Sequence, residues 1–210
     1  MIETEEAAKD FVAGLADGEG IVRLERFGAA LRQENERQNL VSRASLDALW
    51  LRHFADSAQL LAHVPRETSG VWMDLGSGAG LPGLVVSTLR PQMEVVLVES
   101  RKLRIAWLER MVQLLQLENC CVEGARLENV STREAGVISA RAFAPLPKLL
   151  RLSARFSTER TRWVLPKGRS AAQEVQELPR RLHGMFHVEH SLTDREAGVI
   201  VGQGKVRESL

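Results

Sequence analysis

Two carboxylates and a glycine-rich loop form the most specific pattern in this sequence. Residues 74–83 read Asp-Leu-Gly-Ser-Gly-Ala-Gly-Leu-Pro-Gly, and Glu99 ends the next apolar run. Glycines let a loop turn tightly and bring a ligand against bare backbone, and the N–H groups of a following helix face the polar atoms of that ligand. The pattern predicts a nucleotide-like ligand where a strand passes through a loop into a helix.

The spacing admits two interpretations. Gly78-x-Gly80-x-x-Gly83 matches the dinucleotide fingerprint, which favours a nicotinamide-dependent oxidoreductase. An acid at the strand end followed by Leu-Gly-x-Gly resembles instead the first motif of class I S-adenosylmethionine (SAM) methyltransferases. Asp74 would then lie near the methionine end of SAM, and Glu99 would bind the ribose hydroxyls. In a purely structural alternative, Asp74 caps the loop and Glu99 simply ends a strand.

The elements that must position this loop alternate along the chain. Apolar runs predict strands at 71–75, 95–99, 120–123, 137–140, 163–166, 185–190 and 198–202. Helical spacing is found at 81–90, 101–117, 145–157 and 170–179. We therefore expect an α/β, Rossmann-like sheet of the class I methyltransferase type, mostly parallel, with a C-terminal antiparallel hairpin. An acidic N-terminal segment (1–20) and a helical cap (21–65) would precede a SAM-binding domain (66–210).

The N-terminal helices carry polar residues that packing alone does not require. His53 and Asp56 are three residues apart, so they share a helix face. Asn35 and Asn39 are four apart, and we expect them on one face of an earlier helix. These side chains either cap the open end of the ligand cleft or are ordinary packing residues, and their spacing alone leaves both possibilities open.

Charge is nearly balanced overall but unevenly distributed. The formal net charge of the 210 residues is +1, yet residues 141–181 contain ten Lys or Arg against three acids. That excess is either a footprint for RNA or a solvated surface. No apolar run is long enough to cross a membrane and no secretion signal begins the chain, so we expect a cytoplasmic protein. His183, His187 and His190 lack the partners of a metal site, so no metal is expected.

Several segments together resemble the ribosomal RNA small-subunit methyltransferase G family. They are the 74–83 loop, Ile138-Ser-Ala-Arg-Ala-Phe-Ala144, Leu165-Pro-Lys-Gly168, Asn39-Leu40 and His53-x-x-Asp-Ser57. The resemblance covers roughly residues 24–202, and Glu34 departs from it, since the family commonly has Trp there. It implies SAM-dependent methylation of N7 of one guanine in the 530-loop of 16S ribosomal RNA.

Residue roles follow from this resemblance. Cofactor contacts are expected from Asp74, Gly76, Gly78, Leu81, Glu99, Leu127, Glu128 and Arg141. Arg141 and Lys167 would position the guanine, and contacts to RNA are expected from Arg101, Lys102, Arg104, His53 and Asp56. The partner would be 16S ribosomal RNA or the small ribosomal subunit, with no DNA or membrane partner, and the protein is expected to be a monomer. A SAM-binding assembly factor without chemistry remains the competing hypothesis.

Overall fold

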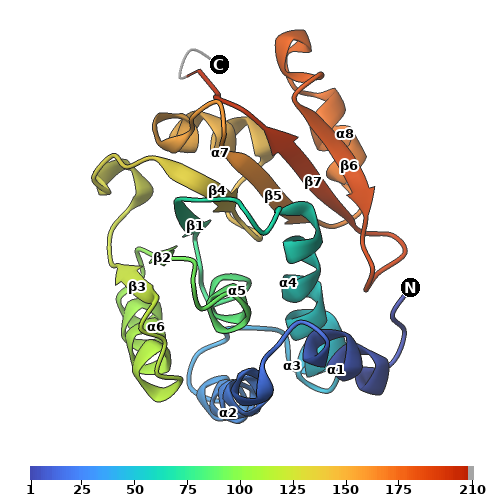
Figure 1. The fold of residues 1–210 in the computed structure, drawn as a ribbon, viewed down its shortest axis with the longest axis vertical. Coiled ribbons are helices and arrows are strands. Elements are labelled where there is room, and N and C mark those ends of the chain that lie inside the picture. The colour runs from blue at the N-terminus through green and yellow to red at the C-terminus, as the bar shows by residue number, and fades with distance from the viewer. Residues whose placement is uncertain (208–210) are drawn as a thin grey trace.

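Seven strands form one sheet in the computed structural model, which describes residues 1–207 (Figure 1). The strands are β1 (Val71–Leu75), β2 (Val95–Val98), β3 (Cys120–Glu123), β4 (Ala135–Ser139), β5 (Arg162–Lys167), β6 (Phe186–His190) and β7 (Gly198–Gln203). Their order is β3-β2-β1-β4-β5-β7-β6. The first five are parallel, whereas β7 runs antiparallel to both β5 and β6. The expected fold, including the C-terminal hairpin, is confirmed.

Helices cover the sheet and extend it at the N-terminus. The N-terminal layer holds α1 (Glu5–Ala13), α2 (Gly18–Glu34), α3 (Arg43–Leu46), η1 (Trp50–Ala55), α4 (Asp56–Ala58) and η2 (Gln59–His63). The crossovers contain α5 (Gly83–Leu89), α6 (Lys102–Leu114), η3 (Leu127–Asn129), α7 (Leu146–Ser153), η4 (Ala154–Phe156), α8 (Ala171–Gln176) and η5 (Arg180–Leu182). Among residues 1–207, none of these helices combines the length and the apolar content needed to span a lipid bilayer.

The central strands β1, β2 and β4 are buried on both faces because their residues are apolar at most positions rather than at alternate ones. Trp72 and Leu97 point into the cluster formed with the N-terminal layer, α5 and α6. Met73 and Val96 point to the other side, into the cluster formed with α7 and α8. This two-sided burial fixes the strand ends, and with them the loops that carry the site.

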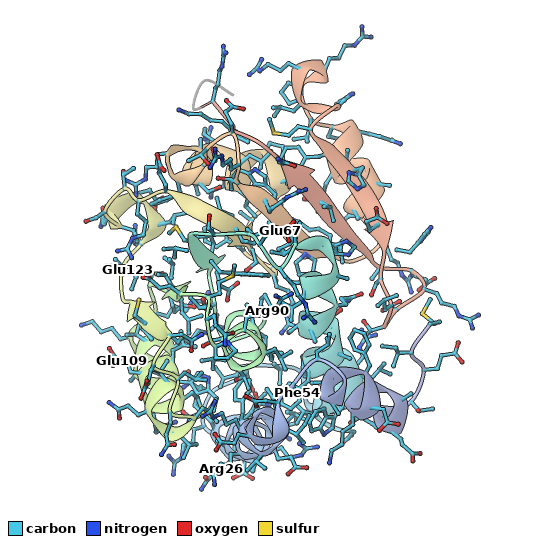
Figure 2. All side chains as sticks on the ribbon, in the orientation of Figure 1. Arg26, Phe54, Glu67, Arg90, Glu109 and Glu123 are labelled. Carbon is cyan, nitrogen blue, oxygen red and sulfur yellow. The ribbon has the colours of Figure 1, made fainter. Side chains whose placement is uncertain are left out.

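Helices α1 and α2 of the N-terminal layer pack against η1 and α4, the helical stretch that carries His53 and Asp56. Phe54, labelled in Figure 2, lies on η1. Its ring stacks on that of Phe27 of α2, with the ring centroids 5.6 Å apart. The Glu5 carboxylate of α1 accepts hydrogen bonds from the backbone N–H groups of Trp50 at 3.0 Å and Leu51 at 2.7 Å. Residues far apart in the chain thus hold η1 in place.

The expectation that Asn35 and Asn39 share a helix face is wrong. Helix α2 ends at Glu34, and Asn39 lies in the irregular segment that follows. The Asn35 side-chain oxygen accepts from the N–H groups of Leu40 at 2.8 Å and Val41 at 3.0 Å. Asn35 therefore satisfies the backbone of the following loop, which is the usual role of a short amide side chain at a helix end.

Candidate functional site

The glycine loop joins β1 to α5 with backbone angles that only glycine adopts easily. Gly76 and Gly78 have φ of +68° and +55°. The Ser77 hydroxyl donates to the carbonyl of Asp74 at 2.9 Å, and the Ser77 carbonyl accepts from the N–H of Gly80 at 2.7 Å. The loop is thus closed on itself, and it lies at the carboxyl end of the sheet, where ligands of α/β folds bind.

Asp74 is buried beneath this loop, and its carboxylate joins three elements. Its Oδ1 accepts from the hydroxyl of Ser139 on β4 at 2.8 Å, and its Oδ2 accepts from the N–H of Gly83 at 3.2 Å. Burial raises the pKa of Asp74, and these hydrogen bonds oppose the rise. Asp74 thereby anchors the loop and the start of α5, and it does not line the cavity described below.

Gly83 allows the close approach of α5 to the sheet. A Cβ at this position would lie 2.2 Å from Cδ2 of Leu97 and 2.8 Å from Oδ2 of Asp74. We expect Gly83→Ala to lower the free energy of unfolding by about 2 kcal/mol, because the methyl group overpacks the core and displaces the anchoring carboxylate. Urea unfolding measures this loss. Gly168→Ala is the control, since nothing lies within 4 Å of its added Cβ, and equal stability of the G83A variant and the wild type would contradict the packing argument.

Glu99 follows the end of β2 and points at the glycine loop. Its Oε1 accepts from the N–H groups of Ser100 at 2.7 Å and Arg101 at 2.9 Å, and its Oε2 accepts from the N–H of Gly78 at 3.1 Å. The Arg104 guanidinium lies 3.9 Å from the same carboxylate. All of these partners are donors, so Glu99 presents an oriented hydrogen-bond acceptor at the loop.

A cavity of about 220 Å³ opens beside Glu99. It is lined by Gly76, Val98, Glu99, Ser100, Arg101, Arg104, Ala125, Leu127, Ala142 and Phe143. A Cβ on Gly76 would come within 2.6 Å of the Phe143 ring, so bare backbone forms part of its wall. One oriented carboxylate between bare backbone and apolar side chains fits the adenosine part of SAM, whose ribose offers two hydroxyl donors and whose base is flat.

The predicted cofactor residues divide into two groups. Gly76, Glu99 and Leu127 line this cavity. Leu81 and Glu128 are outside the set that lines it: the N–H of Leu81 donates to Ser77 and its side chain is buried, whereas Glu128 is exposed. Of the eight predicted cofactor residues, the structure thus gathers three at this cavity, and the other five lie outside its lining: Asp74, Gly78, Leu81, Glu128 and Arg141.

A second cavity of about 850 Å³ lies between the N-terminal layer, the segment 141–145 and the loop between β6 and β7. Its walls include Leu40, Val41, Ser42, Ser45, Arg52, His53, Asp56, Arg141, Pro145, Lys167, Glu174, Ser191, Thr193 and Asp194. Ala142 and Phe143 line both cavities. The segment 141–145 thus separates the two cavities, and we call it the partition.

Arg141, just after β4, lies between His53 and Asp56. Its guanidinium is 3.5 Å from Nδ1 of His53 and 3.5 Å from Oδ2 of Asp56. Burial, followed by the charges of Arg141 and Arg52, lowers the pKa of His53 to about 3. The imidazole is therefore neutral at pH 7, with Nε2 at 2.9 Å from the Ser45 hydroxyl. Because both ring nitrogens have partners, His53 orients Arg141 rather than acting as a free base.

The depressed pKa of His53 makes stability depend on pH. Between pH 6.5 and about 3, the unfolded chain protonates this imidazole and the folded chain does not, so acid favours unfolding. We expect the stability advantage of the wild type over His53→Gln to shrink by about 1 kcal/mol from pH 6.5 to pH 5.5, because the unfolded imidazole is already half protonated at the upper pH. Urea unfolding of both proteins at the two pH values measures this difference, and a constant difference would contradict a buried neutral His53.

Lys167 holds the partition in place. Its ammonium donates to the carbonyl of Ala144 at 3.0 Å and to Glu174 at 2.9 Å. Glu174 also accepts from the N–H of Leu146 at 2.8 Å. Partial burial opposes ionisation of Glu174, but the hydrogen bonds from Lys167, Leu146 and Ser170 outweigh it and lower its pKa. Lys167 and Glu174 thus fix the partition at Ala144 and at Leu146, where the chain enters α7, and no sequence motif indicated Glu174.

Several basic side chains form hydrogen bonds or ion pairs with other residues of the protein. Arg155 donates to the carbonyls of Leu127 at 2.5 Å and Val130 at 2.7 Å. Arg169 pairs with Glu196. At the start of α6, Arg101 and Lys102 are exposed, whereas Arg104 is partly buried beside Glu99. Fewer basic side chains are therefore free to contact a ligand than the sequence suggests.

Two histidines outside the site have partners of their own, and the two cysteines form no disulfide. His183 contacts the carbonyl of Leu178 at 2.6 Å, and His187 pairs with Glu189 at 3.1 Å. Cys120 and Cys121 are free thiols. Within residues 1–207, no cluster of three or more His, Cys, Asp or Glu side chains is arranged to hold a metal ion.

Comparisons with known proteins agree with this geometry. The model of the rRNA small subunit methyltransferase G family matches residues 21–196. The ribosomal RNA small subunit methyltransferase G of Erythrobacter litoralis is 63% identical over 207 residues, covering 99% of this chain and 100% of that protein. Its counterpart in Sphingopyxis alaskensis is 50% identical, covering 98% and 89%.

Solved structures resemble the fold at low sequence identity. A SAM dependent methyltransferase from Aquifex aeolicus has a TM-score of 0.59 and 14% identity, covering 82% of this chain and 98% of that chain. M. jannaschii TYW2 in complex with AdoMet has a TM-score of 0.56 and 13% identity, covering 73% and 76%. At these identities the likeness concerns the fold alone.

Proposed function

This chain belongs to the rRNA small subunit methyltransferase G family, and on that basis we propose that it methylates N7 of one guanine in the 530-loop of 16S ribosomal RNA. The observation that carries the proposal is the pair of cavities that meet at one partition, the smaller beside Glu99 and the larger beside Arg141. SAM, when bound in the smaller cavity, supplies the methyl group. The larger cavity receives the base.

In the cofactor pocket, the proposal gives each residue a definite contact. Glu99 accepts hydrogen bonds from the ribose hydroxyls, and the backbone of Gly76 and Gly78 lies against the methionine and ribose parts of SAM. Leu127 packs on the adenine. Asp74 acts from below, because its bond to the N–H of Gly83 fixes the loop.

The chemistry requires orientation rather than proton transfer. N7 of guanine carries a lone pair and no proton, so its attack on a methyl group needs no general base. This agrees with the engaged ring nitrogens of His53. The rate then depends on holding N7 in line with the methyl carbon, which proximity and orientation can accelerate by many orders of magnitude. Arg141 stands at the strand end where the base must enter.

The target guanine has to leave its base stack before it can enter the larger cavity. A loop guanine is cheaper to extrude than a paired one, and the larger cavity has room for a whole base. The exposed Arg101 and Lys102 then contact RNA phosphates near the cofactor pocket. The proposal places the enzyme in the cytoplasm as a monomer, with 16S ribosomal RNA or the small subunit as its partner.

Mapping of the methylated position tests this proposal. Small subunits that lack native modifications are incubated with the protein and SAM labelled in the methyl group, and 7-methylguanine is located by chemical cleavage. The proposal predicts one cleavage site, within the 530-loop. Cleavage elsewhere in the RNA would contradict the assigned target while leaving the SAM site intact.

A further inference from the structure

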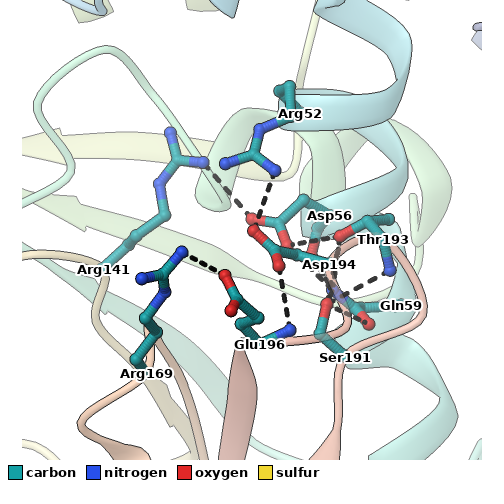
Figure 3. A network of polar contacts seen from close by, with 9 residues as sticks. All are labelled: Arg52, Asp56, Gln59, Arg141, Arg169, Ser191, Thr193, Asp194 and Glu196. Atoms are coloured by element: carbon teal, nitrogen blue, oxygen red, sulfur yellow. Dashed lines mark hydrogen bonds and ion pairs between the residues drawn. The ribbon is translucent and has the colours of Figure 1, made fainter. Parts of the chain in front are cut away.

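Asp56 is a rigidly held carboxylate that faces the larger cavity. Its Oδ1 accepts from the Thr193 hydroxyl at 3.0 Å and from the side-chain amide of Gln59 at 2.8 Å (Figure 3). Its Oδ2 lies 3.5 Å from the Arg141 guanidinium, the nearest hydrogen-bonding partner that this oxygen has among residues 1–207. The side chain is 21% exposed. One oxygen is thus fixed by two donors, and the other is available to a ligand.

The support behind Asp56 is buried and spans two distant parts of the chain. Gln59 is 1% exposed, and its side-chain oxygen accepts from the N–H of Leu192 at 2.7 Å. The hydroxyl of Ser191 lies 3.1 Å from that of Thr193. Such a network fixes the direction of the carboxylate, because its buried polar groups satisfy one another only in this arrangement.

Asp194, the other aspartate of the same cavity, is already neutralised. Its Oδ2 accepts from Arg52 at 2.9 Å and its Oδ1 from the N–H of Glu196 at 3.0 Å. These contacts lower the pKa of Asp194. Of these two aspartates, Asp56 is therefore the one with an oxygen free to accept hydrogen bonds from a ligand. Asp194 serves as its control.

The donors and acceptors around Asp56 match one base. The free oxygen of Asp56 can accept two hydrogen bonds, and guanine presents two donors, N1–H and the N2 amino group, side by side on its Watson–Crick edge. Adenine has an acceptor at N1 and cytosine one at N3, whereas uracil has a single N–H between two carbonyls. The Arg141 guanidinium, next to Asp56, supplies a donor for guanine O6, which adjoins N1.

We propose that Asp56 is the specificity-determining residue of this enzyme, reading the N1–H and N2 amino group of the target guanine while Arg141 binds O6. The inference rests on the proposed function. N7 lies on the opposite edge of the base from N2, so a guanine held by Asp56 leaves N7 free to face the partition and the cofactor pocket behind it. The Asp56 carboxylate thus selects guanine and orients its N7 toward the cofactor pocket.

The test compares guanine with inosine, which lacks only the N2 amino group. Small subunits are reconstituted with 16S ribosomal RNA carrying either base at the methylated position, and single-turnover kcat/KM is measured. We expect the wild type to prefer guanine by about tenfold, as one hydrogen bond to a charged group predicts. In Asp56→Asn, kcat/KM on guanine should fall about 100-fold, and the preference for guanine over inosine should drop to about twofold or less.

Two controls separate this role from others. Asp194→Asn changes a carboxylate of the same cavity and should keep the tenfold preference. The Kd for SAM, measured by calorimetry, should be the same in D56N and the wild type, which also shows that the variant folds.

An unchanged guanine preference in D56N would overturn the inference, because Asp56 would then act only by orienting Arg141. Loss of SAM binding in D56N would overturn it as well, because the carboxylate would then be structural. Absence of methyl transfer by the wild type to either substrate would instead reject the proposed function, and the inference with it.

Discussion

Replacing Glu99 with alanine is expected to raise the Kd for SAM by roughly 10³-fold, about 4 kcal/mol. The carboxylate points at the glycine loop, and the proposed ribose contacts are two hydrogen bonds to a charged acceptor. The same carboxylate fixes the N–H groups of Gly78, Ser100 and Arg101, so its removal also loosens the wall of the cofactor cavity. Isothermal titration calorimetry with SAM measures the effect directly.

Glu123→Ala is the matched control for E99A. Glu123 ends β3 beside β2, pairs with Arg133 at 3.4 Å, and is absent from the lining of the cofactor cavity. Its replacement should change the Kd for SAM by less than about threefold, as expected for a partly exposed ion pair. Unaltered SAM binding by E99A, or NAD binding as tight as SAM binding by the wild type, would contradict the assignment of the pocket.

Replacing Arg141 with methionine should lower kcat/KM for methyl transfer by roughly 10²–10³-fold with little change in the Kd for SAM. The guanidinium lies 3.5 Å from both His53 and Asp56 and lines the larger cavity, into which we propose that the base enters. Methionine keeps most of the length of the side chain but removes every donor. Arg141→Lys should recover only part of the rate, because an ammonium lacks the planar fork of donors. Single-turnover assays on unmodified small subunits measure both variants.

Arg169→Met is the control for Arg141. Its guanidinium pairs with Glu196 at the surface, and its side chain is 80% exposed. We expect its rate to stay within about threefold of the wild type, since exposed ion pairs contribute little. A similar loss of rate in R169M and R141M would show that general positive charge, and not the position of Arg141, governs the reaction.

The sequence contains most of the information on the fold and on the cofactor loop because those features are local. Apolar runs predict the strands to within about two residues, and the loop between Asp74 and Gly83 carries its own turn chemistry. Glu99 could be placed because the carboxyl ends of neighbouring parallel strands meet at one edge of the sheet.

The larger cavity could not be built from the sequence because its contacts are long-range. Asp56 and Thr193 are 137 positions apart, and no spacing rule connects a helix residue to a loop near the C-terminus. Lys167 illustrates a second limit. Its position at a strand end was predictable, but its partners Ala144 and Glu174, which make it an anchor of the partition, depend on how α8 packs.

The identity of the methylated nucleoside is the most direct test of the central claim. Unmodified small subunits are given one turnover with the protein and SAM labelled in the methyl group, and the RNA is then digested to nucleosides and separated by chromatography. We expect one label per subunit, all of it in 7-methylguanosine. Label in another nucleoside, or no label from a protein that binds SAM tightly, would contradict it.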